Sequence, residues 1–406
     1  MKELFSLGEL YVSDFIKDDS DYTNRKKYEM KFLLDEETGA VRLETQPPKE
    51  TMWGKYWYRS GTNQTMREQL KDVVDCTSKM VSLKPLDTWL DIACNDGTLL
   101  SYVDKSLIRV GCDPCEDSFV EESQKHADCI IQDYFSKEAV GNIEPKVVTT
   151  IAMFYDLSEP SKFIRDVYNI LEDDGIWTVQ IHYTPLMLKQ MEFSNFVHEH
   201  SYYYSLFNLK KLFEDNGFRI INCSLNETNG GSLRVYAVKD KADVTNFGTQ
   251  QQRDVWKINI ESLLEWEKTL NLDKSETWTD FKTKIDELKE QTLTFLHQAK
   301  SEGKRVFGYG ASSKGNTFLQ YFGIDSSLIE YMVERSPYKF GLKTIGSNIP
   351  IISEEQSREL KPDFMFVLPW FFISEFVKRE KEFLDEGGKF VVPCPKFEII
   401  GSETKR

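Results

Sequence analysis

The stretch DTWLDIACNDGTLLSYV, residues 87–103, decides the fold. An apolar run carrying Asp91 near its end leads into a tight turn with Gly97, and a helical pattern starts behind the turn. In an open α/β sheet, such a turn places bare backbone and a helix N-terminus at the carboxyl edge of a strand, where ligands bind. The stretch lacks the three glycines of the dinucleotide fingerprint, so a pyrophosphate is not the expected ligand.

Two further acids end the next two predicted strands. Asp113 follows IRVGC and is placed to hold ribose hydroxyls, and Asp133 follows CIIQ and is placed to accept a hydrogen bond from an adenine amino group. Each acid alone is explained equally well as a solvated strand end. Together with Gly97, the three strand-end acids predict an adenosine-type cofactor.

The middle of the chain, residues 65–240, alternates strand-like and helix-like patterns, which is typical of parallel βαβ units. A helix is expected over 160–174, with Gly175 as its stop. The predicted strands are 88–94, 108–113, 129–133, 147–153, 176–183, 219–226 and 232–239.

Three other segments flank this region. Residues 1–64 predict a small β-rich module in which DEETG, residues 35–39, forms a hairpin turn. Residues 241–303 predict two connecting helices. Residues 304–406 return to α/β alternation, with strands expected within 305–312, 328–336, 363–370 and 387–395.

Composition restricts the classes of function. The net charge of −15 over 406 residues argues against binding to nucleic acid or to an anionic membrane surface. No apolar run reaches the length of a membrane span, and the first residues lack the order of a signal peptide, so a soluble cytoplasmic protein is expected. Seven scattered cysteines do not form a disulfide framework, and Cys112 and Cys115 have no second pair with which to bind zinc.

The stretch FVHEHSYYYS, residues 196–205, holds two of the five histidines of the chain. His198 and His200 flank Glu199, and three tyrosines follow. Imidazole titrates near neutral pH, so the cluster indicates proton transfer. A metal-binding pair and a purely structural cluster packed under the tyrosines are the alternatives.

A second glycine-bearing turn lies in KRVFGYGASSKGNTFLQYFGI, residues 304–324. Its glycines let the backbone approach a phosphate, and Ser312, Lys314 and Asn316 can donate hydrogen bonds. The spacing differs from that of the P-loop, which argues against an NTPase. A tight turn with no ligand is the alternative.

These motifs together resemble a known family. DIACNDGTLL, GCDP and QDYF resemble the cofactor motifs of class I S-adenosylmethionine-dependent methyltransferases. YWYRSGTNQTM (56–66), the histidine cluster, NGGSLRV (229–235) and the C-terminal motifs resemble the sugar C-methyltransferases of deoxysugar pathways. The resemblance implies a class I methyltransferase Rossmann-like domain, a second Rossmann-like α/β domain and the small β-rich module. It places S-adenosylmethionine at Tyr58, Ser60, Asp91, Ala93, Asn95, Gly97, Asp113, Pro114, Asp133, Tyr134 and Ala152.

The resemblance also implies the reaction, which is methylation of a carbon next to the ketone of a nucleotide-linked keto-deoxysugar. His200 is expected as the base that forms the enolate, with Glu199 orienting it or contacting the sugar and His198 beside them. The family's tyrosine, three residues before the second histidine, is Val197 here, and His182 is a possible replacement. Nucleotide-sugar contacts are expected from Tyr202, Asn229, Gly230, Arg234, Ser312, Lys314, Asn316 and Arg335.

Two features leave other functions open. Family members usually begin with a zinc module built on cysteine pairs, but no cysteine precedes Cys76 and residues 1–75 hold no histidine, so no zinc is expected. Methyl transfer to a sugar oxygen or nitrogen would need no enolate. A non-catalytic nucleotide-sugar-binding protein of the same fold would explain both Val197 and the missing cysteines. The sequence does not indicate an oligomeric state.

Overall fold

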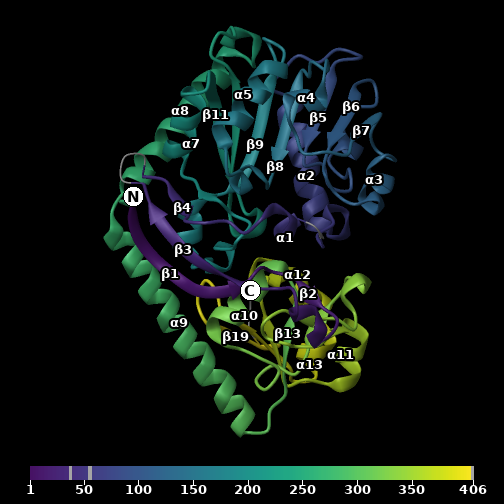
Figure 1. Cartoon of the computed structure of the whole chain (residues 1–406), viewed down its shortest axis with the longest axis vertical. Helices are drawn as coiled ribbons and strands as arrows, with labels where there is room; N and C mark the ends of the chain where they lie inside the picture. The colour runs from purple at the N-terminus through teal and green to yellow at the C-terminus, as the bar shows by residue number, and fades with distance from the viewer. Residues whose placement is uncertain (36–38, 54–56, 404–406) are drawn as a thin grey trace.

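The computed structural model describes residues 1–35, 39–53 and 57–403 (Figure 1). It has a mixed α/β architecture with a seven-stranded sheet, a six-stranded sheet and a small N-terminal sheet. This confirms the predicted fold class. Within the described residues, no helix is long and apolar enough to cross a membrane.

The N-terminal sheet is antiparallel and draws its last strand from far along the chain. β1 (Lys2–Tyr11), β3 (Lys27–Leu34) and β4 (Val41–Leu43) follow the alternating apolar pattern, and β10 (Tyr202–Tyr203) pairs with β4. The predicted hairpin turn at 35–39 lies partly outside the described residues. The short strand β2 (Phe15–Ile16) pairs instead with β15 (Lys343–Thr344), which joins this module to the C-terminal unit.

The seven-stranded sheet has the order β11-β12-β9-β8-β5-β6-β7. Its inner strands are buried on both faces, which explains their continuous apolar runs. β11 and β12 are antiparallel to their neighbours, and the remaining pairs are parallel. The strands are β5 (Thr88–Ile92), β6 (Ile108–Cys112), β7 (Cys129–Ile131), β8 (Val147–Ile151), β9 (Ile176–His182), β11 (Phe218–Asn226) and β12 (Ser232–Lys239).

Short helices connect these strands, and two expectations need correction. After Gly97 the chain forms only a 3-10 turn, Leu100–Tyr102, where a helix was predicted. Helix α5 (Pro160–Ile170) ends at Leu171, which is extended, so Gly175 belongs to the next turn and does not stop the helix. The other helices of this unit are α1 (Lys49–Trp53), α2 (Gln64–Ser78), α3 (Asp117–Ser123), α4 (Lys137–Val140), α6 (Thr184–Lys189) and α7 (Leu206–Glu214).

The C-terminal unit is a second, smaller sheet with the order β16-β14-β13-β17-β18-β19. All neighbouring strands of this sheet pair in parallel except β19, which pairs antiparallel with β18. The strands are β13 (Val306–Tyr309), β14 (Met332–Glu334), β16 (Ile351–Ser353), β17 (Phe364–Val367), β18 (Lys389–Val392) and β19 (Glu398–Ile400). The helices are α10 (Ser313–Phe322), α11 (Glu354–Leu360), α12 (Ile373–Arg379) and α13 (Lys381–Asp385).

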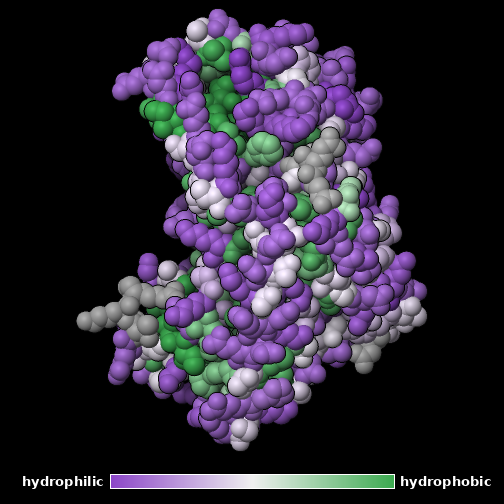
Figure 2. Space-filling view, turned by 90° about the vertical axis from the view of Figure 1, so that its left-hand side faces the viewer, coloured by the Kyte–Doolittle hydropathy of each residue, from purple (hydrophilic) through white to green (hydrophobic). Residues whose placement is uncertain are grey.

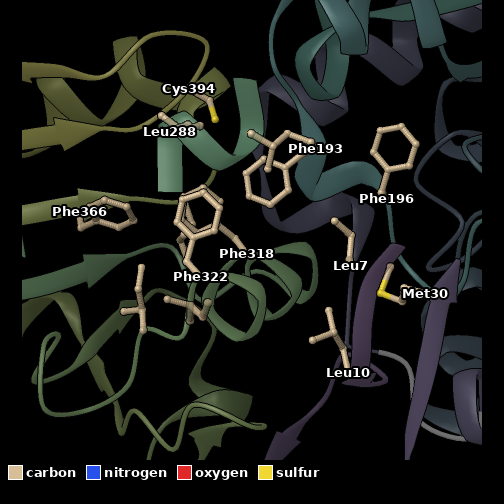
Figure 3. Close-up of a cluster of buried hydrophobic side chains, with 14 of the residues drawn as sticks. Leu7, Leu10, Met30, Phe193, Phe196, Leu288, Phe318, Phe322, Phe366 and Cys394 are labelled. Carbon is tan, nitrogen blue, oxygen red and sulfur yellow. The ribbon is translucent and has the colours of Figure 1, made fainter. Parts of the chain in front are cut away.

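Two long helices connect the units. α8 (Gln250–Lys268) packs on β11, and α9 (Ser275–Ser301) runs along one side of the molecule beside β1 (Figure 1). One apolar core is common to the N-terminal sheet, α9 and the C-terminal unit (Figure 3). On the face in Figure 2, hydrophilic side chains predominate and apolar ones gather in small patches.

Candidate active site

A cavity of about 460 Å³ opens at the carboxyl ends of β5, β6 and β8, and we call it the strand-edge cavity. This volume lies in the range of small-molecule sites. Apolar residues such as Leu99, Phe135 and Met153 supply part of its wall. The predicted cofactor residues that line it are Tyr58, Ser60, Asp91, Ala93, Asn95, Asp113, Pro114, Tyr134 and Ala152.

The turn after β5 is held by the acid that follows β6. The Asp113 carboxylate accepts hydrogen bonds from the backbone N–H of Asn95 (2.8 Å) and of Cys115 (2.9 Å). Ala93 and Asn95 adopt positive φ angles of 61° and 52°, which non-glycine residues adopt at a cost. The Asn95 side chain accepts from the N–H of Ser60 (3.1 Å), so segment 58–61 is tied to the same turn.

Asp91 at the end of β5 is buried and accepts a hydrogen bond from the Thr149 hydroxyl (2.7 Å). Burial raises the pKa of its carboxyl to about 7. Buried carboxylates of this kind accept from hydroxyl and amino groups of a ligand. These hydrogen-bond acceptors therefore fit the ribose hydroxyls and amino groups of S-adenosylmethionine.

Two predicted cofactor residues do not line the strand-edge cavity. A Cβ on Gly97 would lie 2.7 Å from Cα of Ser123, and the φ of Gly97 is +75°, so this glycine allows close packing behind the turn. Asp133 is exposed, and its carboxylate accepts from the backbone N–H of Tyr134 (2.7 Å). Its neighbour Tyr134 faces the cavity instead.

A second cavity, of about 350 Å³, lies between the seven-stranded and six-stranded units, and we call it the central cavity. The predicted residues that line it are His182, Glu199, His200, Asn229, Ser312, Lys314 and Arg335. Tyr58, Ala152, Asp156 and Asn229 line both cavities. Two ligands bound in the two cavities would therefore meet at these four residues.

The titratable residues of the central cavity form one cluster. Nε2 of His200 lies 4.0 Å from Oδ1 of Asp156, on the wall between the two cavities. Tyr155 packs against both imidazoles, with ring centroids 4.3 Å from His200 and 5.0 Å from His182. Nζ of Lys314 lies 2.7 Å from Nε2 of His182, although the two residues belong to different units.

Burial shifts the pKa values of this cluster. Burial and the Lys314 cation hold the pKa of His200 well below its usual range, so its imidazole is neutral near pH 7. Burial raises the pKa of Glu199 to about 7 and that of Asp156 well above its usual range. A neutral imidazole beside a protonatable carboxyl is suited to accept a proton.

Three buried polar atoms at the central cavity have no hydrogen-bond partner among the described residues: Oδ1 of Asp156, Nδ1 of His182 and Oε2 of Glu199. Leaving such an atom unpaired costs about 1–3 kcal/mol. Because the three come from three different segments, a single ligand with several polar groups would satisfy them together. The central cavity is therefore a candidate binding site.

Other predicted residues lie outside both cavities. The segment around His198 turns, with the N–H of His200 donating to the carbonyl of Val197 (3.3 Å), so the two histidines diverge. Nε2 of His198 contacts the carbonyl of Tyr28 in the N-terminal sheet (3.1 Å). We therefore remove His198 from the catalytic candidates.

Arg234, Tyr202 and Asn316 also face away from the cavities. Arg234 is buried under α2, where it pairs with Asp72 (2.9 Å). Tyr202 stacks on Tyr204, with ring centroids 5.6 Å apart. The Asn316 amide donates to the carbonyl of Asp14 (3.0 Å) and joins the C-terminal unit to the N-terminal module. None of these three residues lines either cavity.

Gly230 lies at a contact between the two units, and Arg335 lines the central cavity. A Cβ on Gly230 would meet the Glu192 carboxylate at 3.3 Å and the Trp370 ring at 3.4 Å, so this glycine permits close contact between the units. Arg335 lines the cavity and is 3.6 Å from Glu375. Its guanidinium is half exposed and can turn toward an anion.

Sequence reasoning missed Asp156 and Tyr155. Both lie in a 3-10 turn, Phe154–Asp156, directly after β8. Asp156 is an acid close behind a predicted strand, like Asp113 and Asp133, and that signal could have found it. Tyr155 had no comparable signal, because its position between two imidazoles depends on tertiary packing.

Comparison with known proteins agrees with this geometry. Residues 62–222 match the family model of a methyltransferase domain, and residues 227–395 match that of the C-methyltransferase C-terminal domain. The protein is an S-adenosylmethionine-dependent methyltransferase. It resembles the C-methyltransferase NovU of Streptomyces niveus, with 26% identity over 360 residues that cover 87% of this chain and 83% of the relative.

Solved methyltransferase structures match part of this chain. An S-adenosylmethionine-dependent methyltransferase from Clostridium acetobutylicum shares 11% identity and covers 43% of this chain and 92% of its own, with a TM-score of 0.34. Magnesium protoporphyrin IX methyltransferase from Synechocystis, solved with its bound cofactor, shares 16% identity and covers 43% and 78%, with a TM-score of 0.32.

Metal ligands are a separate question. Over the described ranges, no group of three or more histidine, cysteine, aspartate and glutamate side chains is placed to hold a metal ion. Neither the pair Cys112 and Cys115 nor the pair His198 and His200 gains further ligands there.

Proposed function

We propose that the protein methylates a carbon of a nucleotide-linked keto-deoxysugar bound in the central cavity, with S-adenosylmethionine in the strand-edge cavity. The observation that carries this proposal is the placement of His200. Its Nε2 is 4.0 Å from Asp156, a residue that lines both cavities. A base at this wall can act on a carbon that faces the cofactor.

Different residues of the chain have different roles in the proposed reaction. Bound S-adenosylmethionine supplies an electrophilic methyl group. His200, held neutral by burial and Lys314, takes the proton from the carbon next to the ketone, which leaves an enolate. Glu199 and Asp156 each present an unpaired oxygen to the sugar and hold it in line with the methyl group. The carbonyl re-forms when the new carbon–carbon bond is made.

The nucleotide part is proposed to lie at the C-terminal side of the central cavity. Ser312 caps α10, and its side chain accepts from the N–H of Gly315 (3.1 Å), which fixes the glycine-bearing turn. Arg335 lies across the same cavity and can pair with the diphosphate. Lys314 is directed to the sugar end, because its Nζ contacts His182 and Asn195.

The test uses solvent deuterium exchange. The protein is incubated in D₂O with a panel of nucleotide-linked keto-deoxysugars and no cofactor, and exchange next to the ketone is followed by NMR. We expect exchange with at least one member, and mass spectrometry should show one added methyl group when the cofactor is supplied. Methylation without exchange would indicate transfer to oxygen or nitrogen. Binding with neither result would indicate a non-catalytic nucleotide-sugar-binding protein.

A further inference from the structure

Lys314 reaches out of its own unit into the methyltransferase unit. It lies in the first turn of α10, and its Nζ contacts Nε2 of His182 at the end of β9 (2.7 Å) and Oδ1 of Asn195. Lys314 is 132 positions from His182 and 119 from Asn195 in the sequence. Their contact exists only because the two units pack together around the central cavity.

The contact fixes where His182 carries its proton. An ammonium group has three donors and no lone pair, so the imidazole Nε2 must be the acceptor. Burial and the neighbouring cation hold the pKa of His182 well below its usual range, so the ring is neutral. A neutral imidazole that accepts at Nε2 carries its single proton at Nδ1.

Nδ1 of His182 is one of the buried atoms with no hydrogen-bond partner among the described residues. His182 is 6% exposed and lines the central cavity beside His200, with ring centroids 5.4 Å apart. The Nδ1–H group is therefore a hydrogen-bond donor without an acceptor, and it lies close to the proposed base. A carbonyl oxygen of the sugar is the acceptor that this site lacks.

The charges around Lys314 keep it protonated at neutral pH. Burial lowers the pKa of its ammonium to about 8, and the carboxylates of Glu192, Asp156 and Glu199 act against that shift. The two imidazoles that face it, His182 and His200, stay neutral because burial and, to a lesser extent, the same cation lower their pKa values. The cluster thus combines one ammonium with two neutral rings.

We propose that Lys314 is a positioning residue that fixes the tautomer of His182, so that the Nδ1–H of His182 donates to the ketone oxygen as enolate charge develops. This role rests on the proposed function. No proton leaves His182 in the step: the proton from carbon goes to His200, and the negative charge on oxygen is stabilised by the hydrogen bond. Once the methyl group is on carbon, the oxygen is a ketone again and His200 releases its proton to solvent.

A pH effect follows from the geometry. A neutral amine at position 314 can accept as well as donate, so His182 can then carry its proton on Nε2 and lose the donor at Nδ1. The rate should fall as pH rises through about 8, the pKa of Lys314. Lys314→Arg keeps the cation to higher pH and should move this alkaline fall upward by at least one pH unit.

The direct test is ¹⁵N NMR of the histidine rings in the protein without ligands, with the His182 signals assigned from the spectrum of His182→Asn. At pH 7 we expect the Nδ1–H tautomer in the unchanged protein and in Lys314→Arg, and a mixture in Lys314→Met. Lys339→Met is the matched control, because Lys339 is another buried lysine of this cavity whose Nζ contacts the Ala311 carbonyl (2.8 Å). It should leave the His182 tautomer unchanged.

An Nε2–H tautomer in the unchanged protein, or the same tautomer after Lys314→Met, would overturn the inference. In steady-state kinetics, we expect the kcat of Lys314→Met to be about 10- to 100-fold lower, with a smaller change in KM. The decrease in rate near pH 8 should also disappear in this variant. Retention of that fall would also overturn it. Failure of the proposed function shows separately, as no exchange and no methyl transfer in the unchanged protein, and the NMR result does not depend on it.

Discussion

Phe193 of the methyltransferase unit stacks on Phe322 of the C-terminal unit, with ring centroids 5.1 Å apart and planes 9° from parallel (Figure 3). Both rings are buried in the core that the units have in common. The segment that follows Phe193 carries Asn195, Glu199 and His200. Packing between the units therefore sets the position of the proposed catalytic groups.

Removing the Phe193 ring should destabilise the protein. Phe193→Ala should lower the free energy of unfolding by about 3–5 kcal/mol, through lost burial and the cavity left behind. Chemical denaturation measures this value. Phe207→Ala is the control, because Phe207 is 57% exposed and should change stability by no more than about 0.5 kcal/mol. Equal effects of the two changes would contradict the packing described.

His200→Asn should abolish the base while leaving cofactor binding intact. We expect kcat to fall by roughly 10²- to 10⁴-fold and exchange in D₂O to be lost, with the Kd for S-adenosylmethionine unchanged. Two variants with the same chemical change serve as controls. His297→Asn places it at an exposed site on α9, and His198→Asn places it at a buried site outside both cavities. Full activity in His200→Asn would rule out the proposed base.

Asp113→Asn should weaken cofactor binding, whereas Asp133→Asn should not. Asp113 holds the turn after β5 through two backbone hydrogen bonds and lines the strand-edge cavity. Loss of a charged acceptor costs about 1.5–3 kcal/mol, which raises Kd roughly 10- to 100-fold. Asp133 is the matched control because it is exposed and outside the cavity. Isothermal titration calorimetry distinguishes the two, and a larger effect at Asp133 would contradict the assignment.

Gly97→Ala tests the packing behind the cofactor turn. The new Cβ would lie 2.7 Å from Cα of Ser123 at a φ of +75°, so backbone strain and a clash combine. Gly141→Ala carries the strain alone, since its φ is +68° and nothing lies within 4 Å of the added Cβ. We expect Gly97→Ala to lower Tm clearly more than Gly141→Ala. An equal decrease would show that the contact with Ser123 has no effect.

Stability should depend on pH through Asp91 and Glu199. Burial raises the pKa values of these carboxyls from 3.8 and 4.5 to about 7, so the folded state binds more protons than the unfolded state between those values. Their contribution to stability is full below the unfolded pKa values and is lost as pH rises through about 7. Glu199→Gln should reduce the decrease in Tm between pH 5 and pH 8 in the absence of ligand. Glu290→Gln, an exposed change on α9, should not.

Local sequence patterns predicted much of the fold and part of the site. All seven strands of the larger sheet and four of the six strands of the smaller sheet were recognisable because their runs are short, apolar and followed by turns, whereas β16 and β19 were not predicted. The acids Asp91 and Asp113 were found for the same reason, since a strand end is a local feature. His182, Glu199 and His200 also line the cavity that the motifs indicated.

The remaining features depend on contacts between distant segments. The motif residue Arg234 was expected to bind substrate, but its neighbour in space is Asp72 on α2, which no local pattern reveals. The turn at Val197 sends His198 to the N-terminal sheet, where Tyr28 is its partner. The contact between Lys314 and His182 depends on how the two units pack, so no local pattern indicates it.

The pairing of β2 with β15 has a consequence for synthesis of the chain. Phe15 and Ile16 leave the ribosome before the strand that pairs with them, Lys343–Thr344, which follows on the order of 300 residues later. At 5–20 residues per second, the N-terminal module waits roughly 15–60 seconds before β15 exists. During that interval two apolar side chains and an open strand edge are available to other nascent chains and to chaperones.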